Sequence, residues 1–204
     1  VYTVLFNKGF ITTLYAALAG FGLWRLMKNE NDASMDGYGV VAVARRWVIT
    51  IASLLLFASG AWEINHQFIS RYPAEGFNRL YLLFYTLAFI FVFAIVTSRF
   101  KVLTSPIHQL ALFVAGILLY FLAIGDVFSI QQHLLPGNPA SGHFAAHWIA
   151  AVFFIIIAGS FIRVVRSGLV SPKIDHNVLT WFISVSLVIF VSLEGSLISN
   201  ALFY

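Results

Sequence analysis

Three carboxylic acids stand alone within long apolar stretches of the sequence. Glu63 occurs in "FASGAWEIN", Asp126 in "FLAIGDVF" and Glu194 in "FVSLEGSLI", 63 and then 68 residues apart. An ionised side chain inside a bilayer is costly, and such residues commonly mark paths for ions, protons or substrates. Carboxylates near imidazoles can bind a cation, relay protons or act as general acid and base. These acids are therefore the first candidates for any chemistry of this chain.

Histidines supply the second kind of reactive group. His143 and His147 are four residues apart, a spacing that puts two side chains on one face of a helix, as a metal site requires. A zinc site would need a further ligand, with Asp126 or His133 the plausible donors. The sequence contains no HExxH motif and no cysteine. We predict no metal and no cofactor, and His143 and His147 are the candidate ligands should a metal bind. Haem is disfavoured because these histidines lie at helix ends and do not face each other inside a bundle.

The same acids have a structural interpretation. In an antiparallel helical hairpin the outer end of one span lies beside the outer start of the preceding span, so acids and bases there can pair. The expected pairs are Glu63 with Lys8, Asp126 with Arg79, and Glu194 with His143 or His147. The functional alternative is that the acids gather with histidines on one membrane side, the histidines being His66, His133, His143 and His147. The recurrence of the acids along the chain does not distinguish the structural from the functional interpretation, because a duplicated hairpin would inherit a structural pair as readily as a ligand.

The elements that hold these residues are membrane-spanning helices. The chain is 60% hydrophobic and 10% charged, with a mean hydropathy of +0.90, which is more apolar than a soluble domain of 204 residues can hide in one core. A transmembrane helix needs about 20 apolar residues. Six such stretches occur, at 9–27, 47–65, 80–98, 107–127, 144–162 and 178–202. They are apolar on every face, unlike the alternating strands of a barrel. We predict an all-α, polytopic transmembrane helical bundle in which small residues such as Gly20 and Gly116 let helices approach closely.

Basic residues set the orientation of these spans. Nine of the twelve follow spans one, three and five, namely Arg25, Lys28, Arg45, Arg46, Arg99, Lys101, Arg163, Arg166 and Lys173. The positive-inside rule then places both ends of this segment outside a cell (inner) membrane and the odd-numbered loops in the cytoplasm. Because the basic residues bracket spans and form no single patch, we predict the lipid bilayer as partner and no nucleic acid.

Self-similarity along the chain predicts a repeated unit. The even spans end at the acids, and the odd spans begin with "FNKGF" at 6–10, "FNRLY" at 77–81 and, less closely, "HFAAHW" at 143–148. We predict a single membrane domain, residues 1–204, built from three tandem hairpins at about 6–66, 77–130 and 143–204. We expect it to be a segment of a longer chain, with further spans or other membrane subunits as partners.

The quoted residues resemble a known family. An "FN" plus a base opening one span, with an acid in "WEIN" or "IGDVF" closing the next, is similar to the bacterial many-span membrane proteins catalogued as domain of unknown function 2339. The resemblance covers essentially the whole chain. It implies repeated hairpins in a bacterial cell membrane, and it supplies no catalytic residues because the activity of that family is unknown.

Two functions fit these patterns. The first is a multi-pass membrane module, a scaffold or part of a transport or channel-like assembly, since many transporters contain repeats. The alternative is an outward-facing enzyme acting on a lipid or lipid-linked glycan, with Glu63, Asp126 or Glu194 as base and His147 as partner. Acids that each lie within hydrogen-bonding reach of their own hairpin's base and of nothing else favour the scaffold. Acids that converge with His147 on one cavity favour the enzyme or an ion site.

Overall fold

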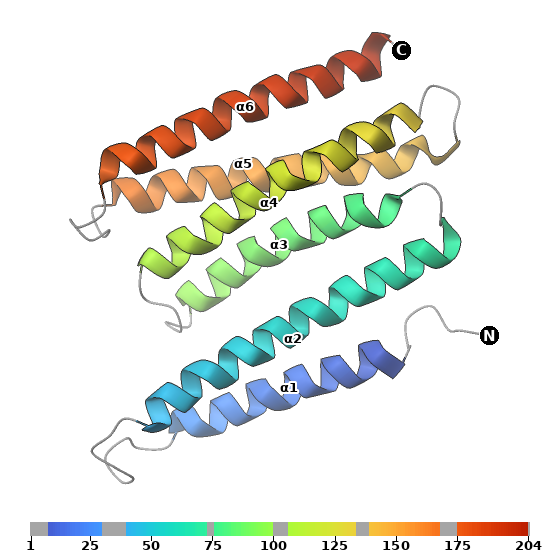
Figure 1. Ribbon diagram of the computed structural model, residues 1–204. Coiled ribbons are helices and arrows are strands. Elements are labelled where there is room, and N and C mark those ends of the chain that lie inside the picture. Colours follow the sequence, from blue (N-terminus) through green and yellow to red (C-terminus); the bar gives the residue numbers. More distant parts are fainter. Residues whose placement is uncertain are drawn as a thin grey trace. The chain divides into compact units, whose positions relative to one another are not determined.

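The computed structural model describes residues 8–29, 40–72, 76–99, 106–133, 139–167 and 175–203. These residues form helices α1 (Lys8–Asn29), α2 (Val40–Arg71), α3 (Phe77–Arg99), α4 (Pro106–His133), η1 (Pro139–Phe144, a 3₁₀ helix), α5 (Ala145–Arg166) and α6 (His176–Phe203) (Figure 1). No strand occurs among them, which confirms the all-α class. Within these ranges, six helices are long and apolar enough to cross a membrane, as in a multi-pass membrane protein. They cover the six predicted spans.

Helix ends follow local sequence signals. Gly76 takes a positive φ of 68° just before α3, a conformation that glycine adopts without strain, and its carbonyl accepts a hydrogen bond from the Arg79 backbone N–H at 3.0 Å. Pro106 is the first residue of α4, where the missing N–H costs nothing. Asp175 caps α6, because its Oδ1 accepts the backbone N–H of Asn177 at 2.8 Å.

The chain divides into two compact units, Val1–Ser70 and Arg71–Tyr204. In the first unit, α1 and α2 approach each other closely at small residues. A Cβ added to Gly20 would lie 2.8 Å from the Cβ of Ala52, and the hydroxyl of Ser59 donates to the carbonyl of Phe10 at 3.5 Å. Close approach matters because lipid removes the hydrophobic driving force between helices and leaves packing to hold them. The predicted role of Gly20 is confirmed.

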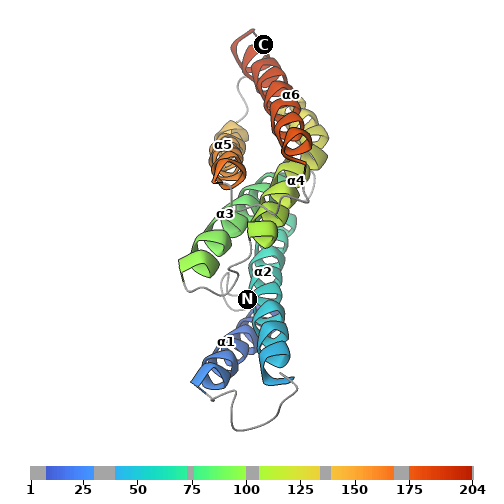
Figure 2. The ribbon, with the colours of Figure 1, turned by 90° about the vertical axis from the view of Figure 1, so that its left-hand side faces the viewer.

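In the second unit, α3, α4 and α5 contact one another pairwise, and α6 contacts α4 and α5. Figure 2 shows α6 beside α4. Successive helices run antiparallel (Figure 1). Each helix buries a stripe of residues spaced three or four apart, such as Leu83, Leu87 and Ile90 on α3. Gly116 faces Ile157, whose Cδ1 would lie 3.2 Å from an added Cβ, as predicted for a close helix contact. α5 packs more extensively on α3 and α4 than on α6, and the tandem-hairpin arrangement remains a prediction.

Helix α6 has the narrowest contact with the rest of its unit. It buries a single stripe, consisting of Ile183, Ser186, Phe190, Glu194 and Leu197. Its other faces expose large apolar side chains, among them Trp181 at 72% and Val188 at 67%. Side chains of this kind suit contact with lipid tails. Apolar character is therefore similar all round the helix and does not by itself select the face that packs inward.

Candidate functional site

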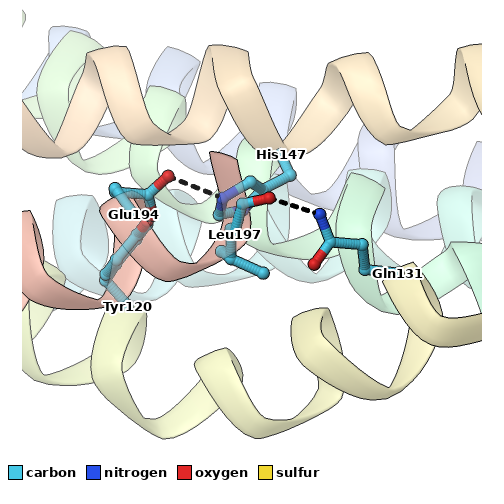
Figure 3. Close-up of polar contacts among 5 residues, drawn as sticks. All are labelled: Tyr120, Gln131, His147, Glu194 and Leu197. Atoms are coloured by element: carbon cyan, nitrogen blue, oxygen red, sulfur yellow. Dashed lines mark hydrogen bonds and ion pairs between the residues drawn. The ribbon is translucent and has the colours of Figure 1, made fainter. Parts of the chain in front are cut away.

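A buried polar network joins three helices of the second unit. It consists of Tyr120 on α4, His147 on α5 and Glu194 on α6 (Figure 3). The Tyr120 hydroxyl donates a hydrogen bond to Oε1 of Glu194, and Nε2 of His147 lies 3.1 Å from Oε2. Tyr120 and His147 are fully buried and Glu194 is 7% exposed. The acid thus has both carboxylate oxygens engaged, each by a different helix.

Aromatic packing holds the network in place. Phe190, one turn before Glu194 on α6, stacks on Phe154 of α5 with ring centroids 4.4 Å apart. The Tyr120 ring packs on the same Phe154 at 4.7 Å and on Phe190 at 5.6 Å. These contacts fix the rotation of α6, which brings Glu194 beneath the hydroxyl and the imidazole. A precisely held donor geometry is what makes buried hydrogen bonds strong.

The electrostatics of the network follow from its donors. A buried carboxyl group needs hydrogen-bond partners, and Glu194 has two. For Nε2 of His147 to donate, that nitrogen must carry a proton, an assignment made from the hydrogen-bond pattern. Nδ1 of His147 is then the remaining ring nitrogen, and it is buried with no hydrogen-bond partner among the described residues.

A second polar contact fixes the same helices farther along. The side-chain amide of Gln131 on α4 donates to the backbone carbonyl of Leu197 on α6 at 2.7 Å (Figure 3). Its own carbonyl, Oε1, is buried without a partner among the described residues. Helix α6 is thereby joined to α4 through Glu194 and Leu197 and to α5 through Glu194.

Asp126 pairs with Arg79, as the antiparallel-hairpin argument predicts. The guanidinium Nη1 donates to Oδ1 of Asp126, which joins the start of α3 to the final third of α4. The two side chains are 60% and 42% exposed. This pair lies at a solvent- or headgroup-accessible position, in contrast to the buried Glu194.

Glu63 is buried on α2 and has a hydrogen-bond partner on the same helix. Its Oε1 accepts a hydrogen bond from the side-chain amide of Gln67 at 2.7 Å, one turn farther along α2. The ion pairs among the described residues join Arg79 to Asp126 and His147 to Glu194, and the expected pair between Lys8 and Glu63 is not among them. Lys8 is exposed at the start of α1. His66 is exposed on α2.

His143 and His147 do not face one site. His143 lies in η1, where its Nδ1 is 3.0 Å from the Tyr81 hydroxyl and its ring stacks on Phe77 at 4.7 Å. His147 lies on α5, which begins at Ala145, and its Nε2 contacts Glu194, so the two histidines have different partners; a metal shared by them stays a prediction. Among the described residues, no three or more His, Cys, Asp or Glu side chains form a group that could hold a metal ion.

Sequence reasoning missed Tyr120, Gln131 and Tyr81. A tyrosine in an apolar span is itself a signal, because a buried hydroxyl usually needs a partner. Gln131 carries the same signal near the end of the fourth span. The missing information is which helices are neighbours, since Tyr120 and Glu194 are 74 residues apart.

Comparison of the chain with protein-family models, with curated proteins and with solved structures finds no match. The interpretation of this site therefore depends on its geometry alone. It is an enclosed acid, imidazole and phenol at the meeting point of three apolar helices.

Proposed function

We propose that this chain is a scaffold module of a multi-pass membrane protein, in which polar side chains fasten apolar helices to one another. The observation that carries the proposal is the double attachment of Glu194 to Tyr120 and His147. It supplies helix-to-helix connections at the place where apolar packing is least extensive. We extend the proposal to the predicted repeated hairpins, the inner-membrane orientation and the relationship to domain of unknown function 2339, which the quoted sequence patterns support.

The partners of the acids favour a scaffold over an outward-facing enzyme. Asp126 and Glu194 have separate partners, and the base that each engages belongs to its own predicted hairpin, while the Tyr120 hydroxyl joins Glu194 to the preceding hairpin. A general base must also be within reach of a substrate proton. Glu194 is enclosed by aromatic rings and has both oxygens occupied, so a lipid or glycan would have to displace Tyr120 or His147 first.

One observation favours a second function, a proton relay within a transport-like assembly. Nδ1 of His147 is buried and has no partner among the described residues. A carboxylate hydrogen-bonded to an imidazole with one nitrogen still open is a pair of groups that can pass a proton between them. Ionisable chains of this kind recur in membrane pumps and transporters.

Proton flux separates the two functions. The chain is reconstituted in liposomes that contain a pH-sensitive dye, and a potassium diffusion potential is applied. A scaffold leaves the internal pH no different from that of protein-free liposomes. A proton leak present in the wild type and abolished by Glu194→Gln would replace the scaffold proposal with the relay, because the variant keeps the side-chain shape and removes the titratable group.

The orientation within this proposal has its own test. The sequence has no cysteine, so a single introduced cysteine is labelled without background. Gln132 near the end of α4 and Asn177 at the start of α6 are both exposed. In whole cells a membrane-impermeant maleimide should label Gln132→Cys and not Asn177→Cys. The reverse pattern would overturn the assigned orientation.

A further inference from the structure

A groove opens between α3, α4 and α5 at the end of the second unit opposite the polar network. Its volume is about 390 Å³, and it is lined by Phe91, Ala94, Ile95, Ser98, Arg99, Phe113 and Ser160. No acid is among these residues. A ligand pocket typically measures roughly 300–1,000 Å³. The groove is therefore large enough for a small ligand or for part of a chain-like one.

The walls of the groove offer few free polar groups, although two serines line them. The Ser98 hydroxyl donates to the carbonyl of Ala94 at 2.6 Å and accepts from the side-chain amide of Gln109 at 2.8 Å. The Ser160 hydroxyl donates to the carbonyl of Ile156 at 2.8 Å. Because these donors are already used by the helices, they offer little to a polar ligand. The interior suits a hydrocarbon chain.

One end of the groove is cationic. Arg99 is the last residue of α3 and exposed, and it forms no ion pair within the described parts of the chain. Arg163 follows Ser160 by three residues and so lies on the same side of α5, one turn nearer the helix end. A guanidinium presents a planar set of donors that matches the oxygens of a phosphate.

The length of the groove matches one leaflet of a bilayer. Phe91 and Arg99 are eight residues apart on α3, and at ~1.5 Å per residue they are separated by roughly 12 Å along the helix. Half of a hydrocarbon core of about 30 Å is ~15 Å. With Arg99 at headgroup depth, an acyl chain of the same leaflet would run along the groove toward Phe91.

We propose that this groove binds an anionic phospholipid, with its phosphate at Arg99 and one acyl chain along Ala94, Phe113 and Ser160. The charge at the groove mouth and the apolar, hydrogen-bond-satisfied walls select an amphiphile that is both anionic and chain-bearing. This site is separate from the polar network and does not depend on the scaffold proposal.

Lipid titration of the detergent-solubilised chain tests the site. Binding of phosphatidylglycerol and of phosphatidylcholine is measured by native mass spectrometry, with inorganic phosphate as a third ligand. Phosphatidylglycerol should bind about fivefold more tightly than phosphatidylcholine, which corresponds to roughly 1 kcal/mol for one basic side chain near a headgroup. Phosphate alone should bind far more weakly. Equal binding of the two lipids would refute the preference for an anionic headgroup. Tight binding of inorganic phosphate would refute the assignment of a phospholipid as the ligand.

Two kinds of variant locate the binding. Arg99→Gln should abolish the preference for phosphatidylglycerol, whereas Arg99→Lys should retain it because the charge remains. Arg25→Gln, which removes one exposed cation from α1, is the matched control and should leave the preference intact. Ser160→Leu, which fills the groove, should weaken the binding of both lipids several-fold. The proposal fails if Arg99→Gln behaves like Arg25→Gln, or if Ser160→Leu binds both lipids as tightly as the wild type.

Discussion

Replacing Glu194 by alanine is the sharpest test of how the second unit is held together. The change removes the acceptor of two hydrogen bonds, from the Tyr120 hydroxyl and from Nε2 of His147. Interhelical hydrogen bonds in membrane proteins contribute about 0.6 kcal/mol on average and up to ~1.7 kcal/mol. Loss of two such bonds should lower the free energy of unfolding by roughly 1–3 kcal/mol. We expect a value toward the upper end, because both donors remain buried without an acceptor.

Glu194→Gln separates loss of shape from loss of charge. The glutamine carbonyl can still accept from Tyr120, and its amide can donate to Nε2 of His147 if the imidazole proton moves to Nδ1. Nδ1 has no hydrogen-bond partner among the described residues in either tautomer, so the change replaces an unpaired acceptor nitrogen by an unpaired N–H and leaves the number of unpaired ring nitrogens the same. The expected destabilisation is about 1 kcal/mol or less.

The measurement is the free energy of unfolding in mixed micelles, obtained by titrating a denaturing detergent and following tryptophan fluorescence and circular dichroism. Ser192→Ala is the control on the same helix, because Ser192 is exposed and its hydroxyl bonds only to the Val188 carbonyl, at 2.9 Å. It should change stability by less than ~0.5 kcal/mol. A double-mutant cycle with Tyr120→Phe should give a coupling of about 0.6–1.7 kcal/mol. The network would have no structural role if Glu194→Ala cost no more than the control.

Two further predictions concern other helix contacts. A double-mutant cycle of Arg79→Gln and Asp126→Asn, measured at two ionic strengths, should give a coupling free energy below ~1 kcal/mol that decreases with salt. The reason is that both side chains are largely exposed. A larger coupling that does not depend on salt would contradict this reasoning. Gly20→Ala should destabilise the solubilised chain by roughly 1–3 kcal/mol, because the new Cβ lies 2.8 Å from that of Ala52 and the helices must separate. Gly22→Ala, where an added Cβ meets nothing within 4 Å, should instead stabilise α1 by up to ~1 kcal/mol, and equal effects of the two changes in thermal unfolding would refute the close contact.

Helix number and two ion pairs were predictable from the sequence, because each depends on local information; the pair of Glu194 with His147 was one of two alternatives for that acid. A run of about 20 apolar residues can be recognised as a span directly in the sequence. The Arg79–Asp126 pair follows from the adjacency of consecutive antiparallel helices. The candidate metal ligands His143 and His147 were placed on one continuous helix, whereas the boundary between η1 and α5 falls between them. Where a helix starts depends on turn geometry that the apolar pattern does not encode.

The partners of Glu194 required a different kind of information. A soluble helix shows its inward face as an apolar stripe, but α6 is apolar on nearly every side, so its sequence gives no such stripe. The glutamate itself is the sign of the inward face, since a charged group in a span almost always turns toward the bundle interior. Of its two partners, His147 was one of the two histidines expected for Glu194, whereas Tyr120 had to be found from the packing of α6 against α4.

An acid in an apolar helix can thus define a structure as well as a reaction. In lipid, sliding or rotating α6 by one turn exchanges one set of apolar contacts for a similar set, so packing alone discriminates weakly between registers. Bonds from Glu194 to Tyr120 and His147, on two different helices, are satisfied together in one rotation and one axial position. Every other register leaves a carboxylate, a hydroxyl or an imidazole N–H unpaired in a medium without water, and that cost selects the observed one. Gln131, bonded to the Leu197 carbonyl three residues beyond Glu194, reinforces the same register.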